Sequence, residues 1–237
     1  MKTPSHSERR GLQKAFTLVE LLVTIAIVIV LAALAVIGMR TASAHATAAI
    51  DANDMRSIGA AVVLYASDNN DFLPVTSGGV GPIFKSNTRS ILRPLAPYFG
   101  SEDPEIDTFY PEFAAASWQS ETQGDGGGPS LLVMHRVYSG FGKPDNPSRP
   151  EPNFTPFGYP YPPGKRDPMT LTAAMGRMSN PSSCLMLTEV DKLHPNFRGS
   201  NPGWFEALPE GMAHGDYRLG LYWDGHVSKL DIDLNFK

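Results

Sequence analysis

One uninterrupted apolar segment dominates the N-terminal part of the chain. Residues 21–38 are eighteen in number, and Thr24 is their only markedly polar side chain. This length approaches the roughly 20 residues that an α-helix needs to cross a hydrocarbon layer of about 30 Å. Arg40 is the one cation close behind the segment. The cations in front of it are Lys2, Arg9, Arg10 and Lys14. By the positive-inside rule, this pattern predicts a membrane-spanning helix with a cytoplasmic N-terminus.

The helical pattern continues beyond the apolar segment as an amphipathic stripe. Small residues fill 41–49, and apolar side chains then recur at three- and four-residue steps, at Met55, Ile58, Val62 and Tyr65. Such spacing places side chains on one helical face. A polar cluster at 67–71 is a predicted helix end. We therefore expect one helix over 16–71, membrane-spanning to about residue 38 and then packed against a globular domain.

The remaining residues, 72–237, are enough for one globular domain with its own core. With 21 prolines and 22 glycines in the whole chain, we expect it to be rich in loops. The apolar pattern predicts a short helix at 91–100, strands at 131–134, 137–138 and 183–190, and a hairpin at 219–230. The hairpin is expected to close through a two-residue Asp-Gly turn. The predicted fold class is α+β, a long N-terminal helix packed on a small, mostly antiparallel sheet.

A proline-rich stretch at 140–168 interrupts these elements. Its nine prolines exclude a central strand, because proline has no backbone N–H to donate to a sheet. Aromatic residues are interleaved with the prolines at Phe141, Phe154, Phe157, Tyr159 and Tyr161. Two interpretations remain open: a long extended loop that packs its aromatic rings on the sheet, or a surface that binds a partner.

Composition and motifs exclude several classes of function. The chain has a net charge of −4 and no cluster of Lys and Arg in the globular domain, which argues against nucleic-acid binding. Its one cysteine, Cys184, forms no internal disulfide and is either buried in a strand or available for an intermolecular bridge. The sequence contains no nucleophile elbow, zinc-protease motif or phosphate-binding glycine loop, so we do not expect an enzyme.

The junction in front of the apolar segment reads Lys14-Ala15-Phe16-Thr17-Leu18-Val19-Glu20. A secretory signal peptide is cut after its apolar region, whereas a cut at this junction leaves the apolar region on the mature protein. The junction resembles the prepilin-type leader of type IV pilins and type II secretion pseudopilins. The resemblance implies that residues 1–15 are a cytoplasmic leader, that prepilin peptidase cuts between Ala15 and Phe16, and that Phe16 is then N-methylated. The family usually has Gly before the cut, so with Ala15 we expect slower processing.

Glu20 is the residue on which the assembly hypothesis depends. A charged carboxylate well inside a bilayer costs about 2.5–3.5 kcal/mol and usually has a partner. Cleavage would give Phe16 an α-amino group, whose usual pKa near 7.7–8.0 leaves it mostly cationic. Pairing between this amine and Glu20 of a neighbouring subunit matches the assembly role of that glutamate in the family. The alternatives are a plain membrane anchor and a signal peptide cut after Ala42 or Ala44, and neither explains the glutamate.

Near the C-terminus, nine residues separate His214 from Asp224-Gly225. This resembles the H-x9-DG motif of a large bacterial group of prepilin-like proteins. One hypothesis is a metal or proton-linked site at which His214, Asp224 and His226 converge. The other is that Asp224 supplies turn geometry and His214 hydrogen-bonds it.

We predict no cofactor for the chain. Calcium is the one ion considered, because some secretion pseudopilins bind it near their C-termini. No EF-hand spacing exists in the sequence. The oxygen ligands available in this region are Asp216, Asp224, Asp231 and Asp233.

Together these features predict a structural subunit of a pilus-like filament, anchored in the inner membrane with a periplasmic globular domain or present in an extracellular filament. The expected partners are prepilin peptidase and other pilin-like subunits. Leu95-Ala96-Pro97-Tyr98 is similar to a Leu-x-Pro-Tyr stretch of secretion pseudopilins, and it favours that system over an adhesive or motile pilus. The alternative is an anchored extracytoplasmic binding protein that does not polymerise.

Overall fold

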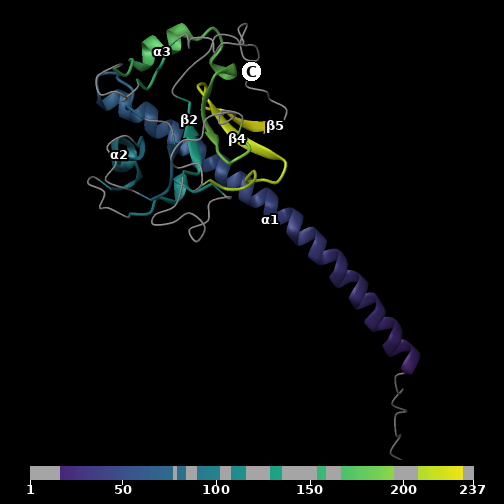
Figure 1. The fold of residues 1–237 in the computed structure, drawn as a ribbon. Helices are drawn as coiled ribbons and strands as arrows, with labels where there is room; N and C mark the ends of the chain where they lie inside the picture. The colour runs from purple at the N-terminus through teal and green to yellow at the C-terminus, as the bar shows by residue number, and fades with distance from the viewer. Residues whose placement is uncertain are drawn as a thin grey trace, which may run out of the picture. The chain divides into compact units, whose positions relative to one another are not determined.

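The structure is a computed structural model. The chain divides into two compact units, residues 1–45 and 46–237. Its first helix, α1 (Leu18–Asp68), includes residues of both units (Figure 1). We call residues 46–237 the head. The residues that the structure describes are 17–76, 79–83, 90–101, 108–115, 129–134, 154–158, 167–194 and 208–231. In the first unit they form the N-terminal part of α1. The helix ends at Asp68, inside the polar cluster where the sequence predicts its end.

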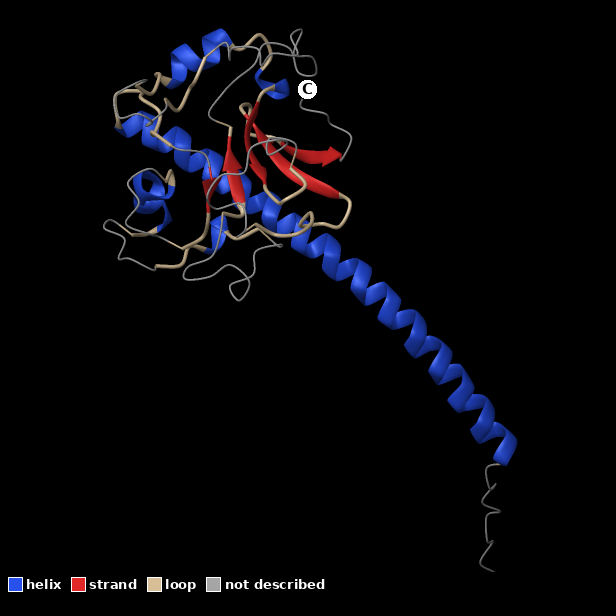
Figure 2. Cartoon of the chain, viewed as in Figure 1, coloured by secondary structure: helices blue, strands red, loops and turns tan. Residues whose placement is uncertain are grey.

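The head contains a five-stranded sheet in which every neighbouring pair is antiparallel and the strand order follows the chain (Figure 2). The strands are β1 (Gly79–Val80), β2 (Leu131–Val133), β3 (Leu185–Glu189), β4 (Tyr217–Tyr222) and β5 (Val227–Asp231). The predicted fold class, α+β with a long N-terminal helix and a small antiparallel sheet, is confirmed. β3 starts later than predicted, because Pro181–Ser183 form a 3-10 turn in which the N–H of Ser182 donates to the side chain of Asn180.

The C-terminal part of α1 packs on the sheet through the predicted stripe. Met55, Ile58 and Val62 are buried in the main core, and Tyr65 is partly buried against it. Gly59 lies in the same contact. A Cβ atom there would come within 3.0 Å of Leu221 Cδ2 on β4, so the absence of a side chain lets the helix approach the strand closely.

Short helical segments complete the described part of the head. The predicted helix at 91–100 is present as α2 (Leu92–Leu95), which continues as a 3-10 turn at Ala96–Phe99. It ends at Gly100, whose φ of 88° is the left-handed conformation that favours glycine at a helix end. The others are a 3-10 turn at Pro111–Phe113 and α3 (Leu171–Arg177), which Thr170 caps through the N–H of Ala173.

Two aromatic residues of the proline-rich stretch belong to the core. Phe154 and Phe157 are buried, and the Phe157 ring lies 5.3 Å from that of Trp223, just after β4. For these two residues the packing interpretation is confirmed. Phe141, Tyr159 and Tyr161 lie outside the described residues, as does the expected strand at 137–138.

Cys184 is not buried in a strand, the first of the two possibilities for it. It immediately precedes β3 rather than lying within it, and its side chain is only partly buried. Burial nevertheless raises the pKa of its thiol. The thiol is therefore less acidic than a free cysteine.

Candidate functional site

The N-terminal end of α1 is closed by a reciprocal pair of side chains. Thr17 donates its backbone N–H and its hydroxyl to Glu20 Oε2, both at 2.8 Å, and Glu20 N–H donates to Thr17 Oγ1 at 3.2 Å. This is a capping box, in which two residues three apart satisfy free N–H groups of a helix start. Glu20 therefore has an intramolecular partner as well as the intermolecular one that the sequence suggests. Ala15 and Phe16 lie outside the described residues.

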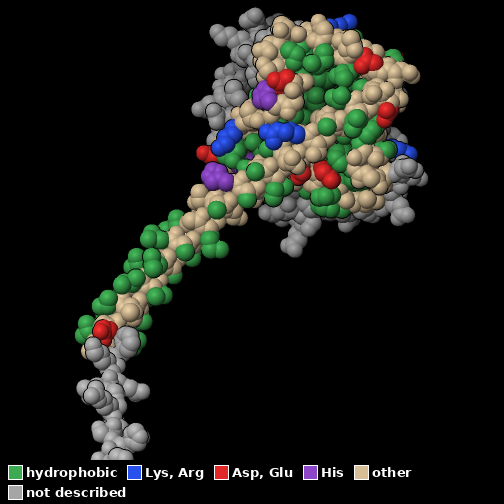
Figure 3. Space-filling view, turned by 180° about the vertical axis from the view of Figure 1, so that it is seen from behind, with side chains coloured by type: hydrophobic (Ala, Val, Ile, Leu, Met, Phe, Trp, Pro, Cys, Tyr) green, Lys and Arg blue, Asp and Glu red, His purple; other side chains and the backbone are tan. Residues whose placement is uncertain are grey.

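The side chains that follow Glu20 are exposed over the first unit of α1. Figure 3 shows apolar side chains covering this stretch of the helix. The large apolar residues from Leu18 to Met39 are solvent-exposed. Among the described residues, α1 is the one helix that is long and apolar enough to cross a membrane. Such a surface requires lipid or other protein around it.

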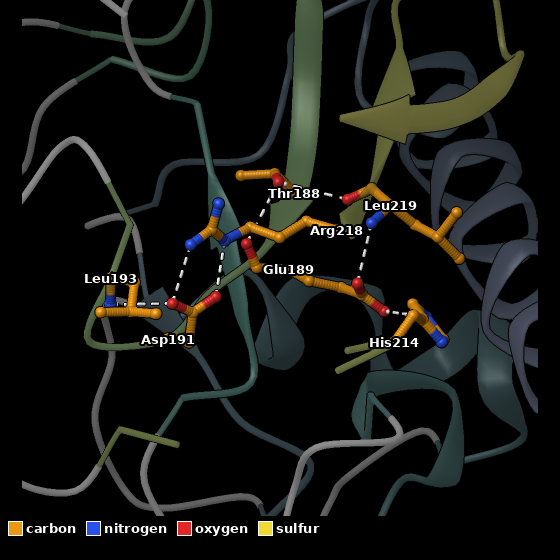
Figure 4. A network of polar contacts seen from close by, with 7 residues as sticks. All are labelled: Thr188, Glu189, Asp191, Leu193, His214, Arg218 and Leu219. Carbon is orange, nitrogen blue, oxygen red and sulfur yellow. Dashed lines mark hydrogen bonds and ion pairs between the residues drawn. The ribbon is translucent and has the colours of Figure 1, made fainter. Parts of the chain in front are cut away.

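In the head, His214 contacts two buried carboxylates, those of Asp51 and of Glu189; Figure 4 shows the contact with Glu189. Its Nε2 atom lies 3.0 Å from Glu189 Oε1 and 3.4 Å from Asp51 Oδ2. The second oxygen of Glu189 accepts the backbone N–H of Leu219 at 2.8 Å. Burial of the imidazole favours its neutral form, but the hydrogen bond to Glu189 and the two carboxylate charges outweigh it, so the pKa of His214 is raised. The contact joins α1, β3 and the loop before β4.

The local sequence explains why these groups meet. Asp51 precedes Met55 by one helical turn, so it continues the buried stripe of α1. Glu189 follows Leu187 by two residues along β3 and therefore shares its face of the sheet. His214 is held over them by stacking on Tyr217, with ring centroids 5.0 Å apart. The ligand-type atoms of Asp51, Glu189 and His214 all lie within 4.8 Å of one another.

The structure does not place His214 against Asp224, although Asp224 accepts the backbone N–H of His226 within the turn. Asp224 pairs instead with His226, whose backbone N–H and Nδ1 lie 3.2 and 2.5 Å from Asp224 Oδ1. His214 and Asp224 flank opposite ends of the six-residue strand β4, which spans about 20 Å. Hence His214 does not pin the turn, and the three residues do not converge.

The hairpin turn also differs from the predicted two-residue type. Gly225 N–H donates to Tyr222 C=O at 2.9 Å, and Tyr222 N–H donates to His226 C=O at 2.9 Å. The loop therefore contains three residues, Trp223 to Gly225. Gly225 has φ of 86°, while Asp224 is not among the described residues with positive φ. This is a three-residue loop with a left-handed glycine, whereas a type I′ turn needs positive φ at both central residues.

A second buried ion pair lies beside the first (Figure 4). Arg218 on β4 donates from Nε and Nη2 to the two oxygens of Asp191, at 2.5 and 2.8 Å. Asp191 Oδ1 also accepts the N–H of Leu193 at 2.8 Å. Both charged side chains are almost fully buried. The pair ties β4 to the loop that follows β3.

Two further carboxylates lie next to the His214 contact. A small, partly open cavity of about 10 Å³ adjoins Asp51 and Glu189. Asp54 and Glu112 also line it. Of the residues considered for calcium, Asp216 and Asp224 are exposed, the side chain of Asp231 is not described, and Asp233 lies outside the described residues.

Comparison with known proteins identifies the N-terminal segment. Residues 10–36 match the family model of the prokaryotic N-terminal methylation motif. This match covers the junction before α1 and most of its exposed apolar part. Together with the long apolar helix, this match supports a type IV pilin-like protein. No curated protein and no solved structure matches it at a significant level.

The motif has direct consequences for this pilin-like protein. It implies processing by prepilin peptidase and assembly with pilin-like subunits. The apolar helix that follows it indicates a membrane anchor. The pilin-like family is structural and non-enzymatic.

Sequence reasoning missed two features that signals in the chain could have revealed. The Thr-x-x-Glu pattern at Thr17 and Glu20 is the signature of a capping box. Asp51 lies one helical turn before Met55, on the helix face that is predicted to be buried. A carboxylate at such a position needs a partner. Neither signal indicates which side chains contact His214.

The turn of the pilin-like head provides a first test. Gly225→Ala is expected to lower the free energy of unfolding by about 1–2 kcal/mol, because an alanine is strained at positive φ. Its added Cβ would meet no atom within 4 Å, so the cost comes from the backbone alone. Urea denaturation gives the value. Gly211→Ala is the matched control, since that glycine has equal space and no positive φ; equal effects of the two substitutions would contradict the assigned turn.

Proposed function

We propose that this pilin-like protein is a subunit of a pilus-like filament, specifically a pseudopilin of a type II secretion system. The observation that carries the proposal is the methylation motif at 10–36, which leads directly into an exposed apolar helix. A plain membrane anchor has no need of a processing motif in front of its apolar segment. A filament subunit needs both, because the segment must leave the membrane and pack against other helices.

The exposed part of α1 fits both environments of such a subunit. In the membrane, its apolar side chains contact lipid. In a filament, the same side chains pack against the helices of neighbouring subunits. Assembly therefore exchanges lipid contacts for helix–helix contacts. We propose that pairing between Glu20 and the amine of Phe16 in a neighbouring subunit guides this exchange.

Two observations support a secretion pseudopilin rather than an adhesive or motile pilus. The first is the Leu-x-Pro-Tyr stretch at 95–98, which is similar to that of secretion pseudopilins. The second is its position. Tyr98 donates its hydroxyl to Asp68 Oδ2 at 2.8 Å, so the stretch is tied to the C-terminal end of α1. A stretch that is fixed to α1 fits a structural role shared by secretion pseudopilins better than it fits a variable adhesive surface.

The proposed topology follows from the charges that flank the apolar segment. Four cations precede it and Arg40 follows it, so the N-terminus stays in the cytoplasm and the head faces the periplasm. The proposed location is the inner membrane before assembly. Prepilin peptidase and other pilin-like subunits are the proposed partners.

The intact mass of the membrane-extracted protein tests the proposal, measured with and without a co-expressed prepilin peptidase. We expect an N-terminus at Phe16 that carries one additional methyl group. An intact Met1 in the presence of the peptidase would support the non-polymerising anchor instead. A terminus near residue 43 or 45 would mean signal-peptide cleavage and release of the head. Either of these two results overturns the proposal.

A further inference from the structure

The contact among Asp51, Glu189 and His214 is unusual in its charge. Asp51 is 6% exposed and Glu189 is 1% exposed, and both approach the same nitrogen of one imidazole. Two more carboxylates, Asp54 and Glu112, line the adjoining cavity. One imidazole supplies at most one positive charge, and Lys229, whose charge also acts on His214, supplies one more against the four carboxylates. The described residues of this site therefore hold more negative than positive charge, and buried charge requires compensation.

Glu112 provides an independent observation at the same place. Its Oε2 atom is buried and has no hydrogen-bond partner among the described residues. Glu112 comes from the 3-10 turn at 111–113, an element separate from those that supply the other three side chains. It lines the same cavity as Asp51 and Glu189. A buried carboxylate oxygen without a hydrogen-bond donor is costly unless a cation or water occupies the space beside it.

We propose that Asp51, Glu189 and His214 bind a divalent transition-metal ion of the zinc or manganese class, beside the cavity that Glu112 also lines. Two of the three separations between the ligand atoms fit this chemistry. Ligand atoms held 2.0–2.1 Å from a tetrahedral ion lie about 3.3 Å apart. The separations from His214 Nε2 are 3.0 Å to Glu189 and 3.4 Å to Asp51.

The type of donor selects the class of metal. A neutral imidazole nitrogen is a good ligand for zinc and other transition metals, whereas calcium and magnesium take oxygen ligands. The second oxygen of Glu189 accepts the Leu219 N–H, which orients this carboxylate as supporting hydrogen bonds do in known metal sites. This site is distinct from the calcium ligands considered near the C-terminus.

The position of the ion gives it a structural role. Its ligands come from α1, from the end of β3 and from the loop before β4. An ion bound there links α1 to the sheet, close to the first residues of the head. This role does not depend on filament assembly, so the site can be tested whether or not the protein polymerises.

The test uses the full-length protein purified in detergent and stripped with EDTA. Zn²⁺, Mn²⁺ or Ca²⁺ is added singly, excess ion is removed by dialysis, and bound metal is counted by mass spectrometry. We expect one equivalent of Zn²⁺ or Mn²⁺ and a raised melting temperature. X-ray absorption of the loaded protein should show nitrogen and oxygen ligands only, at about 2.0–2.2 Å.

Paired histidine variants assign the site. His214→Gln removes the proposed ligand, whereas His226→Gln removes an exposed histidine that is also paired with an aspartate. We expect metal affinity to fall by at least about tenfold in His214→Gln and to remain unchanged in His226→Gln. Asp51→Asn provides a second test in case His214→Gln does not fold, and it should weaken binding similarly.

Three results would overturn the proposal. The wild-type protein could retain no stoichiometric Zn²⁺ or Mn²⁺. Binding could be equally strong in His214→Gln, Asp51→Asn and His226→Gln, which would mean a surface site elsewhere. Calcium could be the only ion retained, which would exclude His214 as a ligand. In any of these cases His214 serves only as a polar contact between Glu189 and Asp51, and the filament proposal is unaffected.

Discussion

Replacing Arg218 with methionine is expected to lower the free energy of unfolding of the head by about 3–5 kcal/mol. Arg218 is 3% exposed and its partner Asp191 is 1% exposed. Methionine keeps much of the apolar stem but removes both hydrogen bonds to Asp191. The carboxylate of Asp191 would then be buried without a compensating charge, which costs far more than the loss of a surface ion pair. Urea denaturation followed by circular dichroism measures the change.

A nearby histidine does not replace the missing charge. Burial, together with the positive charge of Arg218, lowers the pKa of His194 to about 4, although Asp191 opposes the shift. His194 is therefore neutral at pH 7. Removal of Arg218 relieves part of this shift, but the buried imidazole still disfavours a proton.

Two controls separate burial from charge. Lys192→Met breaks the 2.7 Å ion pair with Glu210, whose side chain is 86% exposed, and should cost less than about 1 kcal/mol. Combining Arg218→Met with Asp191→Asn removes the charge that Arg218→Met leaves behind. The double variant should therefore lose less stability than the sum of the single changes. Equal costs for Arg218→Met and Lys192→Met would show that the buried pair contributes no more than an exposed one.

The elements of this fold could be predicted where local signals agree. The stripe of Met55, Ile58 and Val62 follows helical spacing over many residues, and it is buried as expected. Gly100 marks the end of the helical segment at 92–99 through its left-handed backbone. These features depend on residues that are close together in the sequence, so they can be predicted from local sequence patterns.

The turn of the hairpin shows where local signals become ambiguous. Asp224-Gly225 is compatible with a two-residue loop and with a three-residue loop that places only glycine at positive φ. The choice depends on register, which pairs Leu221 with Val227. That register is selected by packing of the whole strand rather than by the turn residues.

The partner of His214 could not be predicted for a different reason. Asp51 and Glu189 are far from His214 in the sequence, and they meet it only because α1 crosses the sheet. The H-x9-DG motif directs attention to Asp224, which lies at the other end of β4 and pairs with His226. Proximity in a motif therefore gave the wrong partner, since the tertiary packing of α1 brings in the actual ones.

Replacing Glu20 with glutamine is expected to abolish filament assembly while leaving membrane insertion intact. Glutamine retains a side-chain oxygen at the third position of the helix, so it preserves the capping box with Thr17. It removes the negative charge that we propose pairs with the amine of Phe16 in a neighbouring subunit. Because an ionised carboxylate in a bilayer is costly, insertion should be unchanged or improved. The yield of sheared filaments should therefore fall to the background level of the preparation.

The matched control is Thr17→Val, which breaks the capping box but keeps the carboxylate of Glu20. The structure gives Glu20 two possible roles, a local one in the helix start and an intermolecular one through its charge. If the charge is decisive, Thr17→Val assembles and Glu20→Gln does not, although the membrane fraction and the mature N-terminus are equal in both. If Glu20→Gln assembles normally and Thr17→Val fails, the carboxylate acts through the helix cap alone. Glu20→Ala removes both functions, so it should be at least as defective as either variant.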